Sequence, residues 1–339
     1  MKVSIIIPVY NVAPYIEQCL LSVYTQSYKK LEIIIVDDRG SDNSMELARR
    51  VSAPYMELFE IIFLEHERNR GISAARNTGI LAATGEYIYF LDSDDSITES
   101  CIEVVVNSME GVKYDFVASD HVVISNKKRG PKLGLESGVV SDSRAIEMAY
   151  YNSQLSMHAW NKLLNREFII SHDIFFKEGI IHEDDLWGFM LANAASLIRV
   201  IKEVTYLHYE RENSIMTSLK FENSMRCRYI IIDTMNDYVS THKDSVDVSV
   251  YSYIEQRKLK MFKRAKLRKV GLRRVLDLYK YIRETPLVDE SKITKRERLY
   301  LFNRRLPVWL GFVYLRVVYR FNRTCEKFHL ISKEGVYVK

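Results

Sequence analysis

The sequence predicts an α/β fold, a mostly parallel sheet flanked by helices, followed by a basic and mostly helical C-terminal region. Apolar, β-rich runs alternate with amphipathic segments in the first half of the chain, which is typical of parallel sheets with right-handed crossovers. The charge then changes sign: residues 1–224 carry 22 Lys and Arg against 32 Asp and Glu, whereas residues 225–339 carry 27 against 12. We therefore expect two units, a domain over residues 1–220 and a basic helical extension over residues 221–339 that faces an anionic partner.

The expected strands are short apolar runs, rich in Ile, Val and aromatic residues, that end in polar loops. In chain order they are Val3–Val9, Leu31–Val36, Ile61–Leu64, Tyr87–Leu91, Phe116–Ile124 and Thr205–Tyr209. The first four runs are apolar at nearly every position, as strands buried on both faces are.

Amphipathic or small-residue-rich segments between these runs predict helices. Pro14 is tolerated in the first turn of the first one, and Asn43 with Glu46 has capping-box spacing at the start of the second. The expected helices are Pro14–Tyr24, Asn43–Val51, Gly71–Ala83, Ile97–Met109, Arg144–Tyr150, Arg166–Ser171 and Asp184–Ala195. The segment Asn126–Gly138 is rich in Lys and Gly and is expected to be an exposed hairpin or mobile loop.

The C-terminal extension is basic, with ten Lys or Arg and no acid between Gln256 and Arg274. Leu306–Leu315 is an uncharged run flanked by arginines, too short to span a bilayer but long enough to lie in its interface. The aromatic residues that we expect at such an interface are Trp309, Phe312 and Tyr314. We favour an anionic membrane surface as the partner, with solvated helices packed on the first unit as the alternative. The acidic first unit gives no support to nucleic-acid binding.

The overall composition is that of a globular protein, with 47% hydrophobic and 27% charged residues. The cysteines are widely spaced, form no metal-ligand or redox pair, and favour a reducing compartment; they are Cys19, Cys101, Cys227 and Cys325. The sequence enters a strand directly, without the pattern of a signal peptide. We expect a cytoplasmic protein, with a peripheral position on the cytoplasmic face of the inner membrane as the finer expectation.

Three carboxylates follow the expected core strand Tyr87–Leu91, namely Asp92, Asp94 and Asp95. Clustered anions at the end of a buried strand normally need a compensating cation, and oxygen ligands suit Mg²⁺ or Mn²⁺. A polar turn followed by a helix cap is the alternative. Because the carboxyl ends of parallel strands meet at one edge of the sheet, where ligands bind, we interpret this turn as a metal site.

Several segments, in order and at ordinary spacing, resemble glycosyltransferase family 2, the inverting transferases of GT-A fold that use nucleotide sugars. They are VSIIIPVYN (Val3–Asn11), IIIVDD (Ile33–Asp38), NRGISAARNTG (Asn69–Gly79), GEYIYFLDSDD (Gly85–Asp95), WNKLLNREFI (Trp160–Ile169), HEDDLW (His182–Trp187) and YLHYERENSI (Tyr206–Ile215). The resemblance covers residues 1 to about 215 and implies a GT-A catalytic domain there.

The resemblance implies a nucleotide site at the ends of the first two strands. Pro8, Tyr10 and Asp38 match the residues that hold the base and ribose, and an aromatic ring and a carboxylate suit stacking and hydrogen bonding to a base. Arg211 matches a segment that folds back over the diphosphate. Arg39 stands where the family usually has glycine, which puts the local turn, though not Asp38, in doubt.

The resemblance also implies the roles of the acidic turn. Asp94 matches the ligand of a divalent metal that bridges the sugar diphosphate, and Asp92 matches a residue that contacts ribose or metal-bound water. The expected ion is Mg²⁺ or Mn²⁺. Arg76 matches a guanidinium beneath the nucleotide, which is expected to pair with phosphate or with Asp92, and a surface ion pair is the alternative.

Glu183 and Asp184 match the family's Glu-Asp pair, whose aspartate is the usual catalytic base. Inversion needs a base across from the metal to remove one proton from the acceptor hydroxyl. We choose Asp184 over the adjacent Asp185, although a helix cap is an ordinary role for either. Trp160 and Lys162 are candidates for the acceptor side, and core packing is the alternative for both.

The predicted function is transfer of a sugar from a nucleotide diphosphate donor, expected to be a UDP-sugar, to a glycan hydroxyl with inversion. By analogy, the expected acceptor is a lipid-linked oligosaccharide in surface polysaccharide synthesis. One alternative is a non-catalytic, membrane-associated scaffold that binds sugar nucleotides. The other is a sugar nucleotidyltransferase, which would need a Gly- and Lys-rich phosphate loop after the first strand, and Val9–Tyr15 has no such loop.

Overall fold

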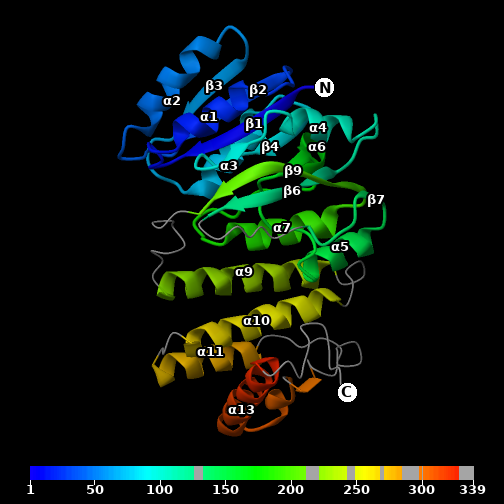
Figure 1. The fold of residues 1–339 in the computed structure, drawn as a ribbon. Helices are drawn as coiled ribbons and strands as arrows, with labels where there is room; N and C mark the ends of the chain where they lie inside the picture. The colour runs from blue at the N-terminus through cyan, green and yellow to red at the C-terminus, as the bar shows by residue number, and fades with distance from the viewer. Residues whose placement is uncertain are drawn as a thin grey trace. The chain divides into compact units, whose positions relative to one another are not determined.

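The computed structural model describes residues 1–125, 133–210, 221–242, 249–267, 271–284, 298–299 and 301–327. The chain divides into two compact units, Met1–Ile231 and Ile232–Lys339, which Figure 1 shows in blue to green and in green to red. The functional division near residue 220 stays a prediction.

A mixed sheet forms the centre of the first unit. Its order is β3 (Glu60–Glu65), β2 (Leu31–Asp37), β1 (Val3–Val9), β4 (Tyr87–Phe90), β8 (Lys162–Asn165), β6 (Phe116–Ile124), β9 (Ile198–Tyr209) and β5 (Ser96–Ile97), with β7 (Gly138–Val140) on β9. The first four strands run parallel, as does β9 beside β6, whereas β8 is antiparallel to both of its neighbours. The expected α/β fold with a mostly parallel sheet is confirmed.

Helices cover both faces of this sheet (Figure 1). They are α1 (Ile16–Tyr24), α2 (Ser44–Ser52), α3 (Ile72–Ala82), α4 (Cys101–Asn107), α5 (Ser143–Tyr151), α6 (Arg166–Ser171) and α7 (Glu183–Ala194), followed by the start of α9 (Phe221–Thr241). Alternate residues of β1 enter opposite layers: Ile5 and Ile7 pack with α1, and Ile6 packs with α3 and α7. This double burial explains the unbroken apolar run of β1.

Two expected elements differ in the structure. The helix expected over Ile97–Met109 begins only at Cys101, because Ser96 and Ile97 pair with β9 instead. The strand expected over Thr205–Tyr209 is correspondingly longer and begins at Ile198, since its first residues pair with β6 and β7. Residues 126–132 of the expected loop lie outside the described residues.

Helix α3 packs unusually close to β1. A Cβ atom on Gly79 would lie 2.3 Å from Cγ2 of Ile6, so only glycine fits this contact. Gly79 follows Arg76 by one turn of the same helix. The close approach therefore fixes the height of Arg76 above the carboxyl ends of the strands.

The second unit is helical, as expected, and comprises the rest of α9, α10 (Ser249–Leu267), α11 (Leu272–Glu284), η3 (Phe302–Arg305) and α13 (Val308–Lys327). Its core contains an aromatic cluster of Phe262, Tyr279 and Phe312, whose ring centroids lie 5.6 to 6.5 Å apart. The expectation that Phe312 lies at a membrane interface is therefore wrong. Among the helices that the structure describes, none combines the length and apolar character needed to cross a bilayer.

Candidate active site

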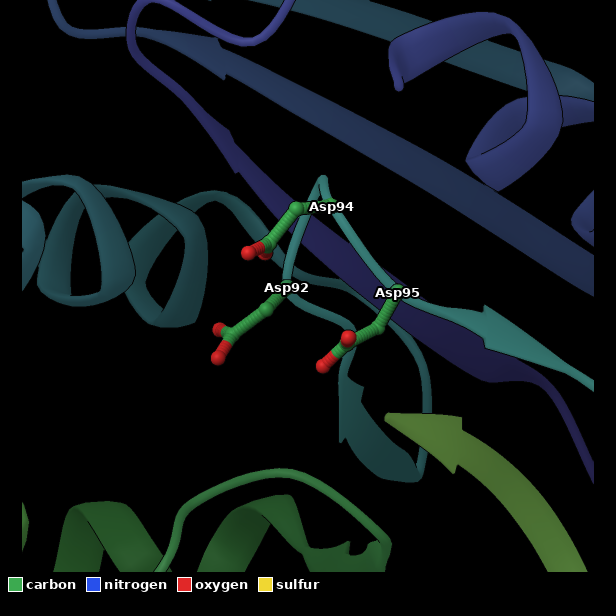
Figure 2. Close-up of side chains that lie close together, drawn as sticks. All are labelled: Asp92, Asp94 and Asp95. Carbon is green, nitrogen blue, oxygen red and sulfur yellow. The ribbon is translucent and has the colours of Figure 1, made fainter. Parts of the chain in front are cut away.

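The turn after β4 carries the acidic cluster expected from the sequence. One carboxylate oxygen each from Asp92, Asp94 and Asp95 lies within 4.8 Å of the others. The turn is closed by a hydrogen bond of 3.0 Å from the Asp95 N–H to the Asp92 carbonyl. In Figure 2 the three side chains project from the turn in roughly the same direction.

Asp95 fastens this turn to β9. Its carboxylate accepts hydrogen bonds from the Tyr206 hydroxyl at 2.7 Å and from the Tyr209 N–H at 2.9 Å, and it lies 3.0 Å from Nδ1 of His208. The hydrogen bond to Asp95 raises the pKa of His208. Asp95 is not a helix cap, since α4 starts after Ser100. Its oxygens are committed to the protein, which leaves the other two carboxylates as the ligands best suited to an ion.

Asp92 and Asp94 fit a divalent cation by their chemistry and placement. Both are partly exposed, and hard oxygen ligands suit Mg²⁺ or Mn²⁺. Burial raises the pKa of Asp92, its pairing with Arg76 opposes the rise, and the charges of Asp95 and Asp184 add to it. Such mutual repulsion is what a bound cation relieves.

Arg76 joins this turn to the start of α7. Its side chain is only 1% exposed; Nη2 donates to Asp92 at 2.9 Å, and Nη1 donates to Glu183 at 3.0 Å and to Asp184 at 3.1 Å. The guanidinium also lies over the ring of Phe176, 5.1 Å from its centroid. Burial alone would lower the pKa of Arg76, but the three carboxylates raise it above its ordinary value. The expected pairing with Asp92 is present, and the contact with α7 is additional.

Glu183 and Asp184 are neighbours in the first turn of α7, but their pKa values are shifted in opposite directions. Burial and the adjacent Asp184 charge raise the pKa of Glu183 to about 7. Burial acts on Asp184 in the same sense, but Arg76, His158 and Lys162 hold its pKa below the ordinary value. Asp184 is therefore the more readily ionised member of the pair.

Asp185 faces a different part of the fold. Its carboxylate lies 3.6 Å from Nη1 of Arg228 on α9, and its carbonyl accepts a hydrogen bond from the Tyr150 hydroxyl. Asp184, in contrast, contacts Arg76, which also pairs with Asp92. The choice of Asp184 over Asp185 stays a prediction.

The loops after β1 and β2 meet at the same edge of the sheet. Pro8 is buried within β1, and Tyr10 follows at its end with 43% of its surface exposed. Arg39 adopts a left-handed backbone with φ of 57°, and its Nε donates to the His66 carbonyl at 2.7 Å. Gly40 is the position that cannot carry a side chain, because a Cβ there would lie 2.8 Å from the backbone nitrogen of Asn11. The turn thus tolerates arginine in place of the usual glycine.

Asp38 organises the loop that leads into α3. Its carboxylate accepts hydrogen bonds from the backbone N–H groups of Arg70 and Gly71 at 2.7 and 2.8 Å, and it lies 2.7 Å from Nδ1 of His66. The other ring nitrogen of His66 bonds to Thr78 at 2.9 Å. This largely buried Asp-His-Thr network therefore shapes the region where the nucleotide base is expected to bind.

Trp160 lies in a stack of rings. It is buried, with Tyr206 parallel to it at 4.5 Å and His158 parallel at 4.6 Å. This packing leaves little of the indole face for a sugar ring. Lys162 is also buried and donates to the His158 carbonyl at 2.6 Å; burial lowers its pKa to about 8, although the nearby Asp184 opposes this shift.

Sequence reasoning missed two histidines of this region and named one residue that lies outside the described residues, Arg211. His66 and His158 each stand alone in the sequence, and a lone histidine is no signal of a site. Only the fold brings His66 to Asp38 and His158 to Asp184.

The mostly parallel α/β sheet, with an acidic turn suited to a cation at its carboxyl edge, has a GT-A-like fold. Solved glycosyltransferase structures share this fold, and two of them serve as examples. One is TarS residues 1–349 of S. aureus in complex with UDP-GlcNAc, with a TM-score of 0.72, 19% identity, and 96% of this chain and 92% of that chain covered. The other is mannosyltransferase PcManGT of Pyrobaculum calidifontis with GDP-Man and Mn²⁺, with a TM-score of 0.50, 17% identity, and coverage of 93% and 86%.

The sequence comparisons give the family. Residues 4–173, half of the chain, match Glycosyl transferase family 2. The uncharacterized glycosyltransferase EpsJ of Bacillus subtilis is 30% identical over 228 residues, which cover 66% of this chain and 65% of EpsJ. The match thus spans just under two thirds of that relative. The chain belongs to glycosyltransferase family 2, whose members transfer sugars from nucleotide-sugar donors.

Proposed function

We propose that the protein is an inverting, metal-dependent transferase that moves a sugar from a UDP-sugar to a hydroxyl of a glycan. The observation that carries this proposal is the bridge made by Arg76, which holds the acidic turn after β4 opposite Asp184 at the start of α7. A metal-binding edge and an ionised carboxylate facing each other across one site are what displacement with inversion needs.

In this proposal Tyr10 and Pro8 hold the base and ribose, and Arg211 would cover the diphosphate. Asp38 shapes the nucleotide site by holding the backbone N–H groups of Arg70 and Gly71. Asp94 and Asp92 would hold Mg²⁺ or Mn²⁺, which when bound would neutralise charge on the departing diphosphate. The complex of TarS with UDP-GlcNAc supports a UDP donor, and the complex of PcManGT with Mn²⁺ supports the metal.

Asp184 removes the proton of the acceptor hydroxyl while the oxygen of that hydroxyl attacks the anomeric carbon of the donor sugar. The bond from that carbon to the diphosphate breaks, and its electron pair leaves with the nucleotide. Glu183 and Lys162 lie beside Asp184 and keep the acceptor side polar. Trp160 would support that side by packing beneath His158.

The donor proposal can be tested by the release of nucleotide from a panel of UDP-sugars and GDP-mannose, with Mn²⁺, with Mg²⁺ and with a chelator. We expect UDP-sugars to be turned over with metal and turnover to stop when the metal is removed. Turnover of GDP-mannose alone would overturn the UDP assignment. Tight binding without any turnover would favour the scaffold alternative.

We propose an anionic membrane surface as the partner of the second unit, and a lipid-linked oligosaccharide at the cytoplasmic face of the inner membrane as the acceptor. Helix α13 has two apolar faces. Phe312 and Leu315 are buried, whereas the opposite stripe is exposed: Trp309 (66% exposed), Leu310, Val313 and Val317. Arg305 and Arg316 are exposed near this stripe. Basic residues beside an exposed apolar stripe suit the interface of anionic lipids.

The membrane proposal can be tested by sedimentation with vesicles. We expect binding to vesicles that contain phosphatidylglycerol, weak binding to phosphatidylcholine vesicles, and at least a tenfold loss when Trp309, Val313 and Val317 are replaced by serine. Equal binding of the variant and the wild type would contradict the role of α13. The residues that the variant changes are exposed, so its folding should be unaffected.

A further inference from the structure

A pocket lies between the start of α3, the loop before α7 and the start of α9. Its cavity has a volume of about 250 Å³, a little below the range of about 300 to 1,000 Å³ that is typical of small-molecule sites. The pocket is lined by residues 69–71, Ser73, residues 179–181, Asn223 and Cys227. A space of this size suits a single sugar ring.

Ser73 lies in the buried part of this pocket and has a hydrogen-bonding group to spare. The residue is only 2% exposed, and its hydroxyl makes no hydrogen bond to the residues that the structure describes. A buried hydroxyl without a partner is unfavourable, so native proteins pair such groups with protein, water or ligand. Because Ser73 lines the cavity, we expect its partner to come from the molecule that fills the pocket.

The wall of the pocket is polar but carries little free charge. Asn69 and Asn223 are exposed and offer amide groups, whereas Ile180 is buried and offers an apolar surface. Among the described residues that line the pocket, Arg70 is the only charged one, and its guanidinium lies 3.0 and 3.2 Å from the carboxylate oxygens of Glu178. Amide, hydroxyl and apolar groups together suit a neutral ligand with several hydroxyl groups.

Helix α9 fixes the wall that precedes α7. The Ile181 N–H donates to Sγ of Cys227 at 3.4 Å, and Arg226 donates to the Gly179 carbonyl at 3.5 Å. Arg226 also donates to Oδ1 of Asn223 at 3.2 Å, which leaves the amide NH₂ of Asn223 as the group for a ligand. The pocket is therefore shaped before a ligand enters it.

The pocket lies between the proposed nucleotide region and the proposed catalytic base. On one side, Asp38 holds the backbone N–H groups of residues 70–71. On the other side, Ser73 precedes Arg76 by one turn of α3, and Arg76 pairs with Asp184. In a displacement with inversion the donor sugar lies between the leaving diphosphate and the catalytic base, because attack comes from the opposite face of the ring. The pocket is thus placed to receive the donor sugar.

We propose that this pocket holds the sugar of the donor and selects an uncharged hexose or N-acetylhexosamine, with Ser73 and Asn223 bonding to its polar substituents. This inference rests on the proposed transferase function and names the class of sugar that is transferred. Asn223 lies beyond the residues that match the family, 4–173, so the match gives it no role. A uronic acid is disfavoured, because its carboxylate would have to displace Glu178 from Arg70 or stay unpaired.

The test measures KM from UDP release and Kd for UDP, both with Mn²⁺, on the wild type, Ser73→Ala and Asn223→Trp. The donors are UDP-linked glucose, galactose, GlcNAc, GalNAc and glucuronic acid. We expect the wild type to use a neutral sugar with a kcat/KM at least about tenfold above that for glucuronic acid. Ser73→Ala, which removes one hydrogen bond, should raise KM for that donor about three- to tenfold, and Asn223→Trp, which fills the mouth of the pocket, at least about tenfold. Because the nucleotide lies outside the pocket, Kd for UDP should stay close to the wild-type value in both variants.

Asn152→Trp is the matched control, because Asn152 is an exposed asparagine at the end of α5 that does not line the pocket. We expect it to keep wild-type kinetics. Ser73→Ala removes an atom that bonds to no described residue, so its Tm should match that of the wild type.

An unchanged KM in Ser73→Ala or in Asn223→Trp would overturn the assignment of the pocket to the donor sugar. Equal weakening of UDP and UDP-sugars would also overturn it and would place the nucleotide base there instead. A preference for glucuronic acid would overturn the neutral class of sugar. A wild type that binds no nucleotide would overturn the transferase proposal itself, and this inference with it.

Discussion

Replacing Asp184 with asparagine is expected to lower the rate of sugar transfer by about 10²- to 10⁴-fold, the range typical of losing a general base or its partner. The amide oxygen of asparagine can still accept from Arg76, so the bridge to Asp92 should survive. We therefore expect nucleotide affinity to stay within about threefold of the wild type. Initial rates at saturating donor, together with calorimetric titration of UDP, separate the two effects.

The neighbouring Asp185→Asn variant is the control. Asp185 pairs with Arg228 rather than Arg76, so its replacement should lower stability more than turnover. A larger loss of kcat in Asp185→Asn than in Asp184→Asn would show that the base has been assigned to the wrong carboxylate.

Replacing Arg76 with methionine is expected to damage both folding and catalysis. The change leaves the carboxylates of Asp92, Glu183 and Asp184 facing one another without their shared cation. Breaking a buried ion pair on one side typically costs about 3 to 5 kcal/mol, whereas an exposed pair is worth about 1 kcal/mol or less. We expect the free energy of unfolding in urea to fall by about 3 kcal/mol. Lys113→Met, which removes a solvent-exposed pair with Glu167, should leave the free energy of unfolding close to the wild-type value.

The pH dependence of the stability of Arg76→Met follows from the charges of the carboxylates that Arg76 contacts. Without Arg76 the buried carboxylates have raised pKa values in the folded state, so they destabilise the fold above their unfolded pKa values. Protonation relieves the repulsion, and the deficit of Arg76→Met should therefore shrink as the pH falls from 8 to 5. A deficit that is constant over this range would contradict the repulsion that we ascribe to the cluster. Arg76→Lys should recover only part of the loss, because one ammonium cannot replace the two-sided guanidinium.

Three parallel strands, β1, β2 and β4, could be predicted closely from sequence because their residues are buried on both faces. Continuous apolar runs such as Val3–Val9 predict burial on both faces of the strand. The short strands β5 and β8 carry no such pattern, since they exist only through pairing with distant partners. Ser96–Ile97 is a strand because β9 lies beside it, more than a hundred residues later in the chain. The β-propensity of the local sequence does not predict such a contact, because the partner strand is distant in the chain.

The candidate site shows the same division. Asp92 and Asp94 could be identified from the sequence because they are charged residues at the end of a core strand. The partners of Arg76 could not, because they depend on how α3 and α7 come together in the fold. His158 is the clearest case, because its contact with Asp184 joins residues from separate elements. On α13 the rotation of the helix about its axis decides which aromatic side chains are buried. Phe312 is buried and Trp309 is exposed, and an uncharged run of ten residues does not predict which of them faces the core.

The central claim, a metal-dependent nucleotide site at the acidic turn, is tested most directly by calorimetric titration of UDP with and without Mn²⁺, on the wild type and on Asp94→Ala. We expect wild-type binding to weaken at least tenfold without Mn²⁺, and Asp94→Ala to bind weakly with or without the ion. Equal affinity in all conditions would contradict the role of Asp94 in holding a metal. Absence of binding by UDP, GDP and dTDP alike would contradict the nucleotide site itself.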